Sequence, residues 1–285
     1  MKTLDADLDL LRRWPLPDLS DGESKEDRGR VLVVGGGREI PGSVLLAAHA
    51  SLRSGAGKLH VALPESAAVL LALALPEARV TGLVMTPRGE IAAADEDLLT
   101  ASSACDALLV GPGMAATDTA RRIATELVSR APAAVIDAGA LGAATHGGAV
   151  ITPHFGEMAN LSNCSKEEVT SRPDELARQH ARDRNVVVTL KGATTYIANP
   201  TGTLWVHRGG TIGLGTSGSG DVLAGVIAGL IAQGAQPDQA AVWGVVLHGA
   251  AGNRLSERIG PLGFLAREIA DEIPPLRALL ARAGG

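Results

Sequence analysis

One pattern recurs along most of the chain: a short run of β-branched residues or leucine ends in glycine or proline, and an alanine-rich stretch follows. The runs expected to form strands are Val31–Val34, Leu59–Leu63, Ala107–Val110, Ala134–Asp137, Ala149–Ile151 and Val186–Leu190. The stretches expected to form helices are Ser43–Arg53, Glu65–Leu73, Thr117–Arg130, Asp174–Arg184, Asp221–Gln233 and Pro237–Arg258. Alternation at these lengths predicts an α/β fold, with a central, mainly parallel sheet and helices on both faces.

Two parts of the chain depart from this alternation. Tyr196–Asn199 and Leu204–His207, joined at Pro200-Thr201-Gly202, predict a hairpin. Residues 1–30 are polar and charged, and we expect an N-terminal extension with a short helix and a surface loop. No break in composition follows, so residues 31–285 are expected to form one domain.

Charge and cysteine content limit the partners and the environment. A formal net charge of −5 leaves no basic stripe for a nucleic-acid backbone, so no nucleic-acid partner is expected. The longest apolar stretch, Val222–Ala232, is too short to cross a bilayer, and residues 1–30 contain no apolar signal segment. Cys105 and Cys164 match neither a metal-binding spacing nor a disulfide framework, which indicates a reducing compartment. We therefore expect a cytoplasmic protein with no membrane partner.

Glycine-rich or polar segments lie at or just after the ends of five expected strands. They are Gly35-Gly36-Gly37, Gly111-Pro112-Gly113, Asp137, Thr152-Pro153-His154 and Lys191-Gly192. Ligands of such sheets bind at the carboxyl ends of the strands. We therefore expect these segments to meet on one rim of the sheet, around a ligand.

The most informative motif is GLGTSGSGD, which ends at Asp221 and runs into an apolar helix. Gly215, Gly218 and Gly220 permit a ligand to approach the backbone closely and allow positive φ. The free N–H groups and the positive dipole end of the helix suit a phosphate. Asp221 is also explained as a simple N-cap, but an N-cap requires none of the glycines. The motif predicts an anion-binding loop for the phosphates of an adenine nucleotide.

Other nucleotide motifs fit less well. Residues 213–218 match the dinucleotide pattern G-x-G-x-x-G, but no clear strand precedes them. Gly111-Pro112-Gly113 does follow a strand, and Asp137 ends the next one, so a Rossmann site stays open as an alternative. Asp137 comes later than that fingerprint requires. No Walker A sequence is present.

Three polar side chains near strand ends have a structural and a functional explanation. His154 is either a packed loop histidine or a ligand contact, and Glu157 either caps the following helix or contributes to the site. Lys191 is either a solvated surface lysine or a ligand contact at a strand end. The remaining histidines make no metal-binding spacing and are interpreted as structural: His49, His60, His146, His180, His207 and His248.

Taken together, these segments resemble the ADP-dependent NAD(P)H-hydrate dehydratase family, which has a ribokinase-like fold. The resemblance runs from about residue 31 to about residue 270. Its segments occur in family order: VLVVGGG at 31–37, PGS at 41–43, RSGAGK at 53–58, GPGM at 111–114, TPHFGE at 152–157, KG at 191–192 and GTSGSGD at 215–221. Six or more ordered segments are far more specific than one glycine loop.

The resemblance implies a reaction in which ADP drives dehydration of the S epimer of NADHX or NADPHX, giving NADH or NADPH with AMP and phosphate. Mg²⁺ would accompany the nucleotide, and related proteins suggest a homodimer or homotetramer. The implied substrate contacts are Ser43, Gly113, His154 and Asp221. The implied nucleotide contacts are Lys191, Gly192, Ala193, Thr194, Thr195, Gly218 and Gly220. Asp221 would accept a proton from the substrate hydroxyl as general base.

The sequence departs from the family pattern at three positions. Gly139 stands where the family commonly has a second aspartate, Ala115 replaces a glycine, and Thr194 replaces another glycine. Two other functions therefore stay open. One is a ribokinase-fold kinase that phosphorylates a small alcohol and releases a stable phosphoester. The other is a non-catalytic nucleotide-binding protein, which Gly139 allows and Asp221 argues against.

Overall fold

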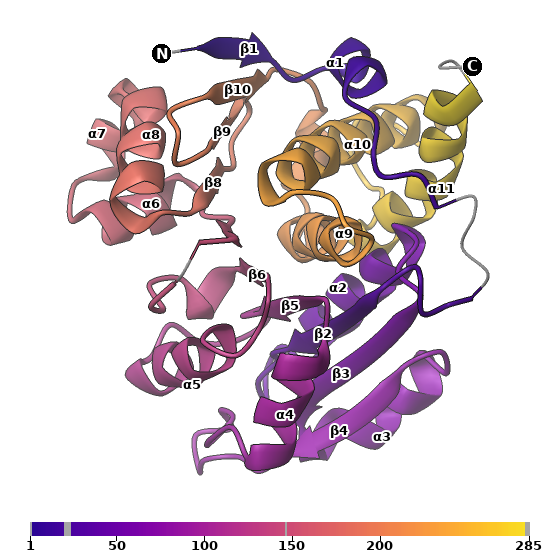
Figure 1. The fold of residues 1–285 in the computed structure, drawn as a ribbon, viewed down its shortest axis with the longest axis vertical. Coiled ribbons are helices and arrows are strands. Elements are labelled where there is room, and N and C mark those ends of the chain that lie inside the picture. Colours follow the sequence, from indigo (N-terminus) through magenta and orange to yellow (C-terminus); the bar gives the residue numbers. More distant parts are fainter. Residues whose placement is uncertain (1, 20–23, 146, 283–285) are drawn as a thin grey trace.

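The computed structural model describes residues 2–19, 24–145 and 147–282, and these contain a ten-stranded sheet (Figure 1). The strand order is β1-β10-β9-β8-β7-β6-β5-β2-β3-β4. The strands are β1 (Thr3–Asp5), β2 (Arg30–Val34), β3 (Lys58–Pro64), β4 (Arg79–Leu83), β5 (Ala107–Val110), β6 (Ala134–Ile136), β7 (Ala149–Ile151), β8 (Val187–Leu190), β9 (Thr195–Ala198) and β10 (Leu204–His207).

The helices occupy the connections between strands and the C-terminal part of the chain. They are α1 (Leu8–Arg13), α2 (Gly42–Arg53), α3 (Glu65–Ala74), α4 (Glu96–Ala104), α5 (Asp118–Val128), α6 (Phe155–Ser162), α7 (Lys166–Ser171), α8 (Pro173–Arg184), α9 (Ser219–Ala232), α10 (Pro237–Arg258) and α11 (Ala266–Arg282). In the described residues no helix is long and apolar enough to cross a membrane.

Strand pairing confirms the mainly parallel sheet. Strands β2 to β8 pair in parallel with their neighbours, and β9 runs antiparallel to both β8 and β10. The expected hairpin is confirmed, with Ala198 opposite Leu204. Because parallel neighbours end at the same edge, the sheet has one rim where the carboxyl ends of seven successive strands meet.

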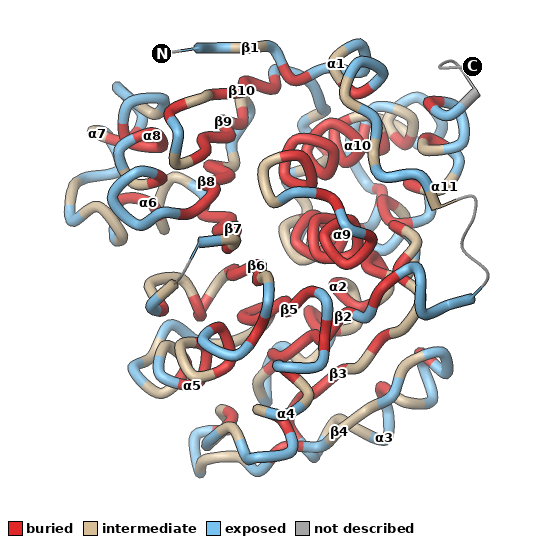
Figure 2. The backbone as a smooth tube through the Cα atoms, viewed as in Figure 1, coloured by how far each residue is buried: buried red, intermediate tan, exposed pale blue. Residues whose placement is uncertain are grey.

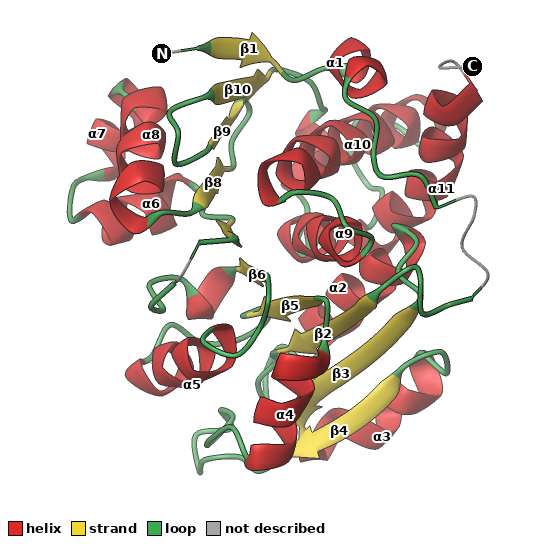
Figure 3. Ribbon diagram, in the orientation of Figure 1, coloured by secondary structure: helices red, strands yellow, loops and turns green. Residues whose placement is uncertain are grey.

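Helices cover both faces of the sheet, as Figures 1 and 3 show. Successive strand residues point to opposite faces, so Val31 and Val33 join one apolar core while Leu32 and Val34 join the other. The first core includes α2, α9, α10 and α11, and the second includes α5 and α8. Figure 2 shows α9 and α10 buried along most of their length. Helix α9 is therefore held rigidly with its N-terminus at the rim.

Sequence patterns missed several elements. They were β1, β4, α4, α7 and α11. Strand β4 contains a glycine and is partly exposed, and α11 contains Pro274 and Pro275, so each lacks the usual signal of its class. Strand β1 has three residues in a charged segment, and only its pairing with β10 defines it.

The N-terminal extension packs against the rest of the fold. It contains the expected helix, α1, whose Leu11 is fully buried, as well as β1 at the edge of the sheet. The Trp14 ring stacks on Trp205 with centroids 5.6 Å apart. The carbonyl oxygen of Trp14 also accepts a hydrogen bond of 2.8 Å from the Trp243 indole. The described part of residues 1–30 thus extends both the sheet and its core.

Candidate active site

The five segments expected at one rim do meet there. The amide of Gly36 donates to the Pro112 carbonyl at 2.7 Å, which joins the ends of β2 and β5. The Thr152 hydroxyl donates to Asp137 Oδ1 at 2.6 Å, which joins the ends of β7 and β6. The Lys191 amide donates to the Pro153 carbonyl at 2.8 Å, which joins β8 to the same group. The prediction of a common rim is confirmed.

The glycine-rich segment ends as the N-terminus of α9. Its N-cap is Gly218, whose φ of +89° is in the left-handed region that favours glycine. The helix begins at Ser219, two residues earlier than the sequence predicts, so Asp221 lies in the first turn. The interpretation of Asp221 as an N-cap is therefore wrong. Within this motif only Gly218 has a positive φ. Gly215 and Gly220, which the sequence also offers for positive φ, have ordinary backbone angles.

The carboxyl group of Asp221 is placed for proton transfer. Its pKa is raised to about 7, chiefly by burial and then by the charge of the neighbouring Asp137, which together outweigh the opposing effects of Ser43 and Lys191. The Ser43 hydroxyl, at the start of α2, donates a hydrogen bond to this carboxylate. A general base works best when its pKa lies near the working pH, and Asp221 meets that condition.

Lys191 is not a solvated surface lysine, so that interpretation is wrong. Its ammonium group lies 2.9 Å from Asp137 Oδ1, and Asp137 is only 3% exposed. Burial opposes the charge on Lys191, but the pKa is raised because Asp137, Glu157 and Asp221 together outweigh that effect. A cation is thus held next to two carboxylates at the end of β8.

The segment implied as a nucleotide site, from Lys191 to Thr195, forms the turn between β8 and β9. Gly192 and Ala193 are exposed, Thr194 is half-buried, and Thr195 begins β9. A Cβ atom added at Gly220 would lie 3.3 Å from Nζ of Lys191, so the turn and the first turn of α9 adjoin. The structure therefore brings the two halves of the implied nucleotide site together.

His154 has a structural contact and a free side. Its Nδ1 accepts hydrogen bonds from the amides of Gly156 and Glu157 at 3.0 and 3.1 Å and caps α6. The Glu157 carboxylate accepts from the His154 amide at 2.8 Å, which completes a capping box and confirms Glu157 as a capping residue. His154 Nε2 lies 3.7 Å from Glu157 Oε1, but the side chain is 61% exposed, so a ligand can reach the ring.

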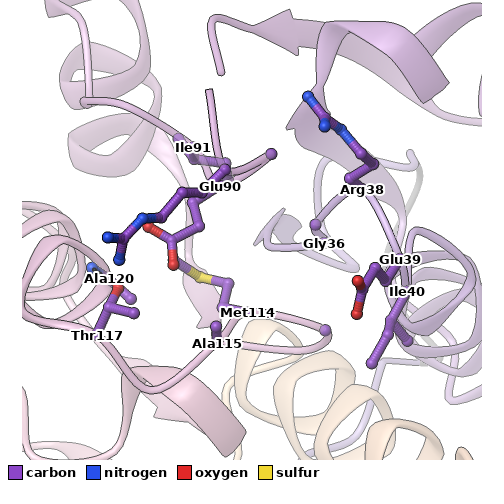
Figure 4. A pocket seen from close by; sticks show the side chains of 14 residues that line it. Gly36, Arg38, Glu39, Ile40, Glu90, Ile91, Met114, Ala115, Thr117 and Ala120 are labelled. Atoms are coloured by element: carbon purple, nitrogen blue, oxygen red, sulfur yellow. Dashed lines mark hydrogen bonds between the residues drawn. The ribbon is translucent and has the colours of Figure 1, made fainter. Parts of the chain in front are cut away.

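A pocket of about 230 Å³ lies beside Gly113 at the β2 and β5 side of the rim. In Figure 4, Arg38, Glu39 and Ile40 lie on one side of this pocket, and Glu90, Ile91, Thr117 and Ala120 lie on the other, with Met114 and Ala115 between them. The excursion between β4 and α4, in which Met85 and Ile91 form a bridge, supplies the second wall. Sequence reasoning missed this wall because an exposed turn with Arg88 and Gly89 resembles any surface loop.

The first two departures from the family pattern lie in contact with each other. A Cβ atom at Gly139 would lie 2.3 Å from the Met114 carbonyl oxygen and 2.5 Å from that of Ala115. An aspartate at position 139 would therefore clash with this backbone. Gly139 permits the loop that carries Ala115 to pack directly on the end of β6.

Sequence reasoning also missed a buried pair under the anion-binding helix. Nε2 of His248 lies 3.0 Å from the Ser219 hydroxyl, and this contact ties α10 to the first turn of α9. Burial lowers the pKa of His248 to about 4, so the ring is neutral near pH 7. This contact agrees with a structural role for His248, whereas His146 lies outside the described residues.

Two further possibilities concern other ligands at the rim. The Rossmann alternative at Gly111-Pro112-Gly113 requires a glycine turn that opens directly into a helix, whereas α5 begins only at Asp118. Among residues 2–19, 24–145 and 147–282, no three His, Cys, Asp or Glu side chains gather as a metal site.

The geometry defines a class of protein. A carboxyl group with a pKa near 7 lies beside a half-buried lysine and a helix N-terminus, at the carboxyl ends of a parallel sheet. Such a site is suited to enzymes that position a phosphate and move a proton.

Comparison with known proteins identifies the family. Residues 31–275 match the family model described as NAD(P)H-hydrate dehydratase, and the chain belongs to that family. It is 48% identical to an ADP-dependent (S)-NAD(P)H-hydrate dehydratase of Xanthomonas campestris over 95% of each chain. It is 30% identical to the enzyme of the same name from Bacillus subtilis, covering 92% of this chain and 94% of that one.

Solved structures agree with this family assignment. The ADP/ATP-dependent NAD(P)H-hydrate dehydratase of Bacillus subtilis, co-crystallised with ATP and Mg²⁺, superimposes with a TM-score of 0.86. The two sequences are 26% identical, and the match covers 98% of this chain and 99% of that one. The expected ribokinase-like fold is therefore confirmed.

Proposed function

We propose that this protein is an ADP-dependent NAD(P)H-hydrate dehydratase, which converts the S epimer of NADHX or NADPHX back to NADH or NADPH. The observation that carries the proposal is Asp221, half-buried in the first turn of α9, with a pKa of about 7 and a hydrogen bond from Ser43. Membership of the dehydratase family supports the assignment.

The chemistry begins with activation of the substrate hydroxyl, a poor leaving group. Asp221 removes the hydroxyl proton while the oxygen attacks the β-phosphorus of ADP, so that a phosphoester forms and AMP leaves. Loss of phosphate, together with a proton from the adjacent ring carbon, restores the dihydronicotinamide. A base with a pKa near 7 accepts the first proton at neutral pH and releases it again.

The phosphates are placed by groups at the rim. The free amides at the N-terminus of α9 and the ammonium of Lys191 stabilise the negative charge of the transferred group. The exposed turn at 192–194 binds the rest of the nucleotide. When bound, Mg²⁺ would neutralise phosphate charge and would be held chiefly by the phosphates themselves, since the described residues contain no group of three potential protein ligands for an ion.

The hydrated dinucleotide lies on the other side of Asp221. The sheet order places β8 and its turn on one side of β6 and the pocket at β2 on the other, so the two ligands approach Asp221 from opposite directions. Ser43 and Gly113 contact the reacting end, and the pocket between Arg38 and Arg88 receives a more distant part. His154 contacts the substrate through Nε2.

The test is turnover of purified NADHX by the protein. With ADP and Mg²⁺ present, absorbance at the NADH band should rise, and AMP or no nucleotide should give no turnover. An equal rate without nucleotide would contradict the proposal. ATP-dependent phosphorylation of a simple alcohol, with a stable phosphoester as product, would instead indicate a kinase.

Assembly and location complete the proposal. We propose a cytoplasmic homodimer or homotetramer. The described thiols, Cys105 and Cys164, are free, which suits a reducing compartment. Helix α3 exposes Val69, Leu70 and Leu73 by 70% or more, and a second copy of the chain would cover them. Light scattering on wild type and Leu70→Glu tests the assembly. The proposal is contradicted if both proteins have the mass of a monomer.

A further inference from the structure

Three carboxylates act on the charge of Lys191, but the one hydrogen-bonded to it among the described residues is Asp137. The ammonium group donates to Asp137 Oδ1 at 2.9 Å, and the same oxygen accepts the Thr152 hydroxyl at 2.6 Å. Asp221 instead takes its hydrogen bond from Ser43, although its charge acts on Lys191. Asp137 is therefore engaged by two donors, and Asp221 keeps its carboxylate available.

We propose that Asp137 is a positioning residue, which holds Lys191 beside Gly220 in the first turn of α9 and out of an ion pair with Asp221. This inference rests on the proposed function, because it explains how Asp221 stays a base next to a cation. The contacts that carry it are the buried Asp137–Lys191 pair and the closeness of the lysine to Gly220, where a Cβ would lie 3.3 Å from Nζ.

The energetic argument concerns the partner that Lys191 would otherwise choose. A desolvated ammonium is costly without an anion, and if Asp137 were neutral the remaining neighbouring carboxylates would be Glu157, which is engaged in the α6 capping box, and Asp221. An ion pair with a cation lowers the pKa of a carboxyl by about 1–3 units. Removal of the Asp137 charge also removes repulsion that raises the pKa of Asp221. Both effects weaken Asp221 as a base.

The other groups around the Asp137–Lys191 pair do not reverse the expected fall in the pKa of Asp221. Glu157 on α6 and Asp221 on α9 both favour the charged form of Lys191. His248 on α10 is neutral near pH 7, since burial lowers its pKa to about 4, and Ser43 on α2 contributes a neutral hydroxyl. The anion in direct hydrogen-bond contact with Lys191 is Asp137.

The first experiment compares the pH profiles of wild type and Asp137→Asn, which is nearly isosteric. The acidic limb of kcat/KM should move to lower pH by about 1–3 units, and KM for ADP should rise several-fold because Lys191 leaves the phosphate position. Asp106→Asn is the matched control, since Asp106 accepts the Arg30 amide at the opposite end of the sheet. A lower melting temperature with an unmoved acidic limb would overturn the inference.

The second experiment needs no turnover. Carbon-13 NMR titration of the aspartate carboxyls, with Asp221→Asn for assignment, measures the pKa of Asp221 directly. The inference requires this pKa to fall in Asp137→Asn, even if the protein proves inactive on NADHX and the proposed function fails. Active enzyme with an unchanged Asp221 pKa would overturn the inference alone. If Asp137→Asn does not fold, Lys191→Met must raise the Asp221 pKa, because a nearby cation has gone, and no change would be contrary evidence.

Discussion

Asp221 lies half-buried beside another carboxylate and takes its hydrogen bond from a neutral hydroxyl, which separates it from the other carboxylates at the rim. Asp137 forms an ion pair with Lys191, and Glu157 accepts a hydrogen bond in the capping box of α6. Asp221 has the Ser43 hydroxyl as its hydrogen-bond donor, and its pKa of about 7 reflects the charge that remains uncompensated. Asp221 can therefore exchange a proton near neutral pH.

Asp221→Asn should abolish most of the turnover. Asparagine keeps the size and can still accept from Ser43, but it cannot take a proton, so turnover should fall by about two to four orders of magnitude. ADP affinity should survive or increase, because a negative charge near the phosphates has gone. Activity within a fewfold of wild type would refute the base assignment.

The same variant has a pH signature in stability. The pKa of Asp221 is raised by folding, so the native wild type binds this proton more tightly than the unfolded chain, and its stability falls as pH rises from about 4 to about 7. The asparagine variant lacks this loss. Its melting temperature should therefore exceed that of wild type at pH 8, and the difference should shrink toward pH 5. A difference independent of pH would contradict the burial of the charge.

His154 calls for two substitutions, because it both caps α6 and exposes Nε2. His154→Ala should lose about 0.5–2 kcal/mol of stability with the cap, whereas His154→Asn supplies another good capping side chain. Both variants lack Nε2, so both should bind NADHX about tenfold to hundredfold more weakly, with ADP binding nearly unchanged. Calorimetry and melting curves check this. Normal NADHX affinity in His154→Asn would leave only the capping role.

At the scale of elements, two kinds of segment make the site. Strand ends bring Asp137, Thr152 and Lys191 together, because neighbouring parallel strands stop at the same edge. Helix α9 adds its N-terminus, which its buried apolar body and the Ser219–His248 contact hold in place. The polar groups are thus mounted on rigid elements rather than on free loops.

The edge of the sheet offers a test of how far the N-terminal extension belongs to the domain. Trp14→Ala removes the stack on Trp205 and should lower stability by about 1–3 kcal/mol, whereas Trp14→Phe should retain much of it. Leu8→Ala is the control, since Leu8 is 37% exposed on α1. Denaturant unfolding measures all three. An unchanged Trp14→Ala would mean that residues 1–30 contribute little to the folded domain.

At the scale of the whole molecule, buried histidines set the tolerance to acid. Burial lowers the pKa of His49, His60, His180, His207 and His248. The unfolded chain therefore binds more protons than the native one below about pH 6.5, and stability falls as pH drops from there. For His248, with a pKa of about 4, the loss approaches about 3 kcal/mol by pH 4.

Melting curves between pH 7 and pH 4 check this expectation. His248→Gln is the informative variant, because it keeps a hydrogen-bonding group near Ser219 and does not titrate. Its curve should be flatter than that of wild type across this range. A wild-type melting temperature that rises toward pH 4 would show that protonation of Asp221 outweighs the histidines.

Sequence by itself determined the fold class and the identity of the rim segments. Short runs of β-branched residues or leucine and alanine-rich helices are local patterns, and strand ends marked by glycine or a polar residue predict the rim without coordinates. The family resemblance added the roles expected for Ser43, His154 and Asp221, which turnover and binding measurements have yet to test.

Only the tertiary structure decided how the rim residues divide their tasks. The sequence left Asp221 as either an N-cap or a base, and the position of Gly218 at the N-cap removed the first choice. It left Lys191 as either solvated or functional, and the pairing with Asp137 depends on the order of strands β6, β7 and β8. Burial and charge proximity arise from segments far apart in the chain, and they set the pKa values. A local pattern carries no information about those distances.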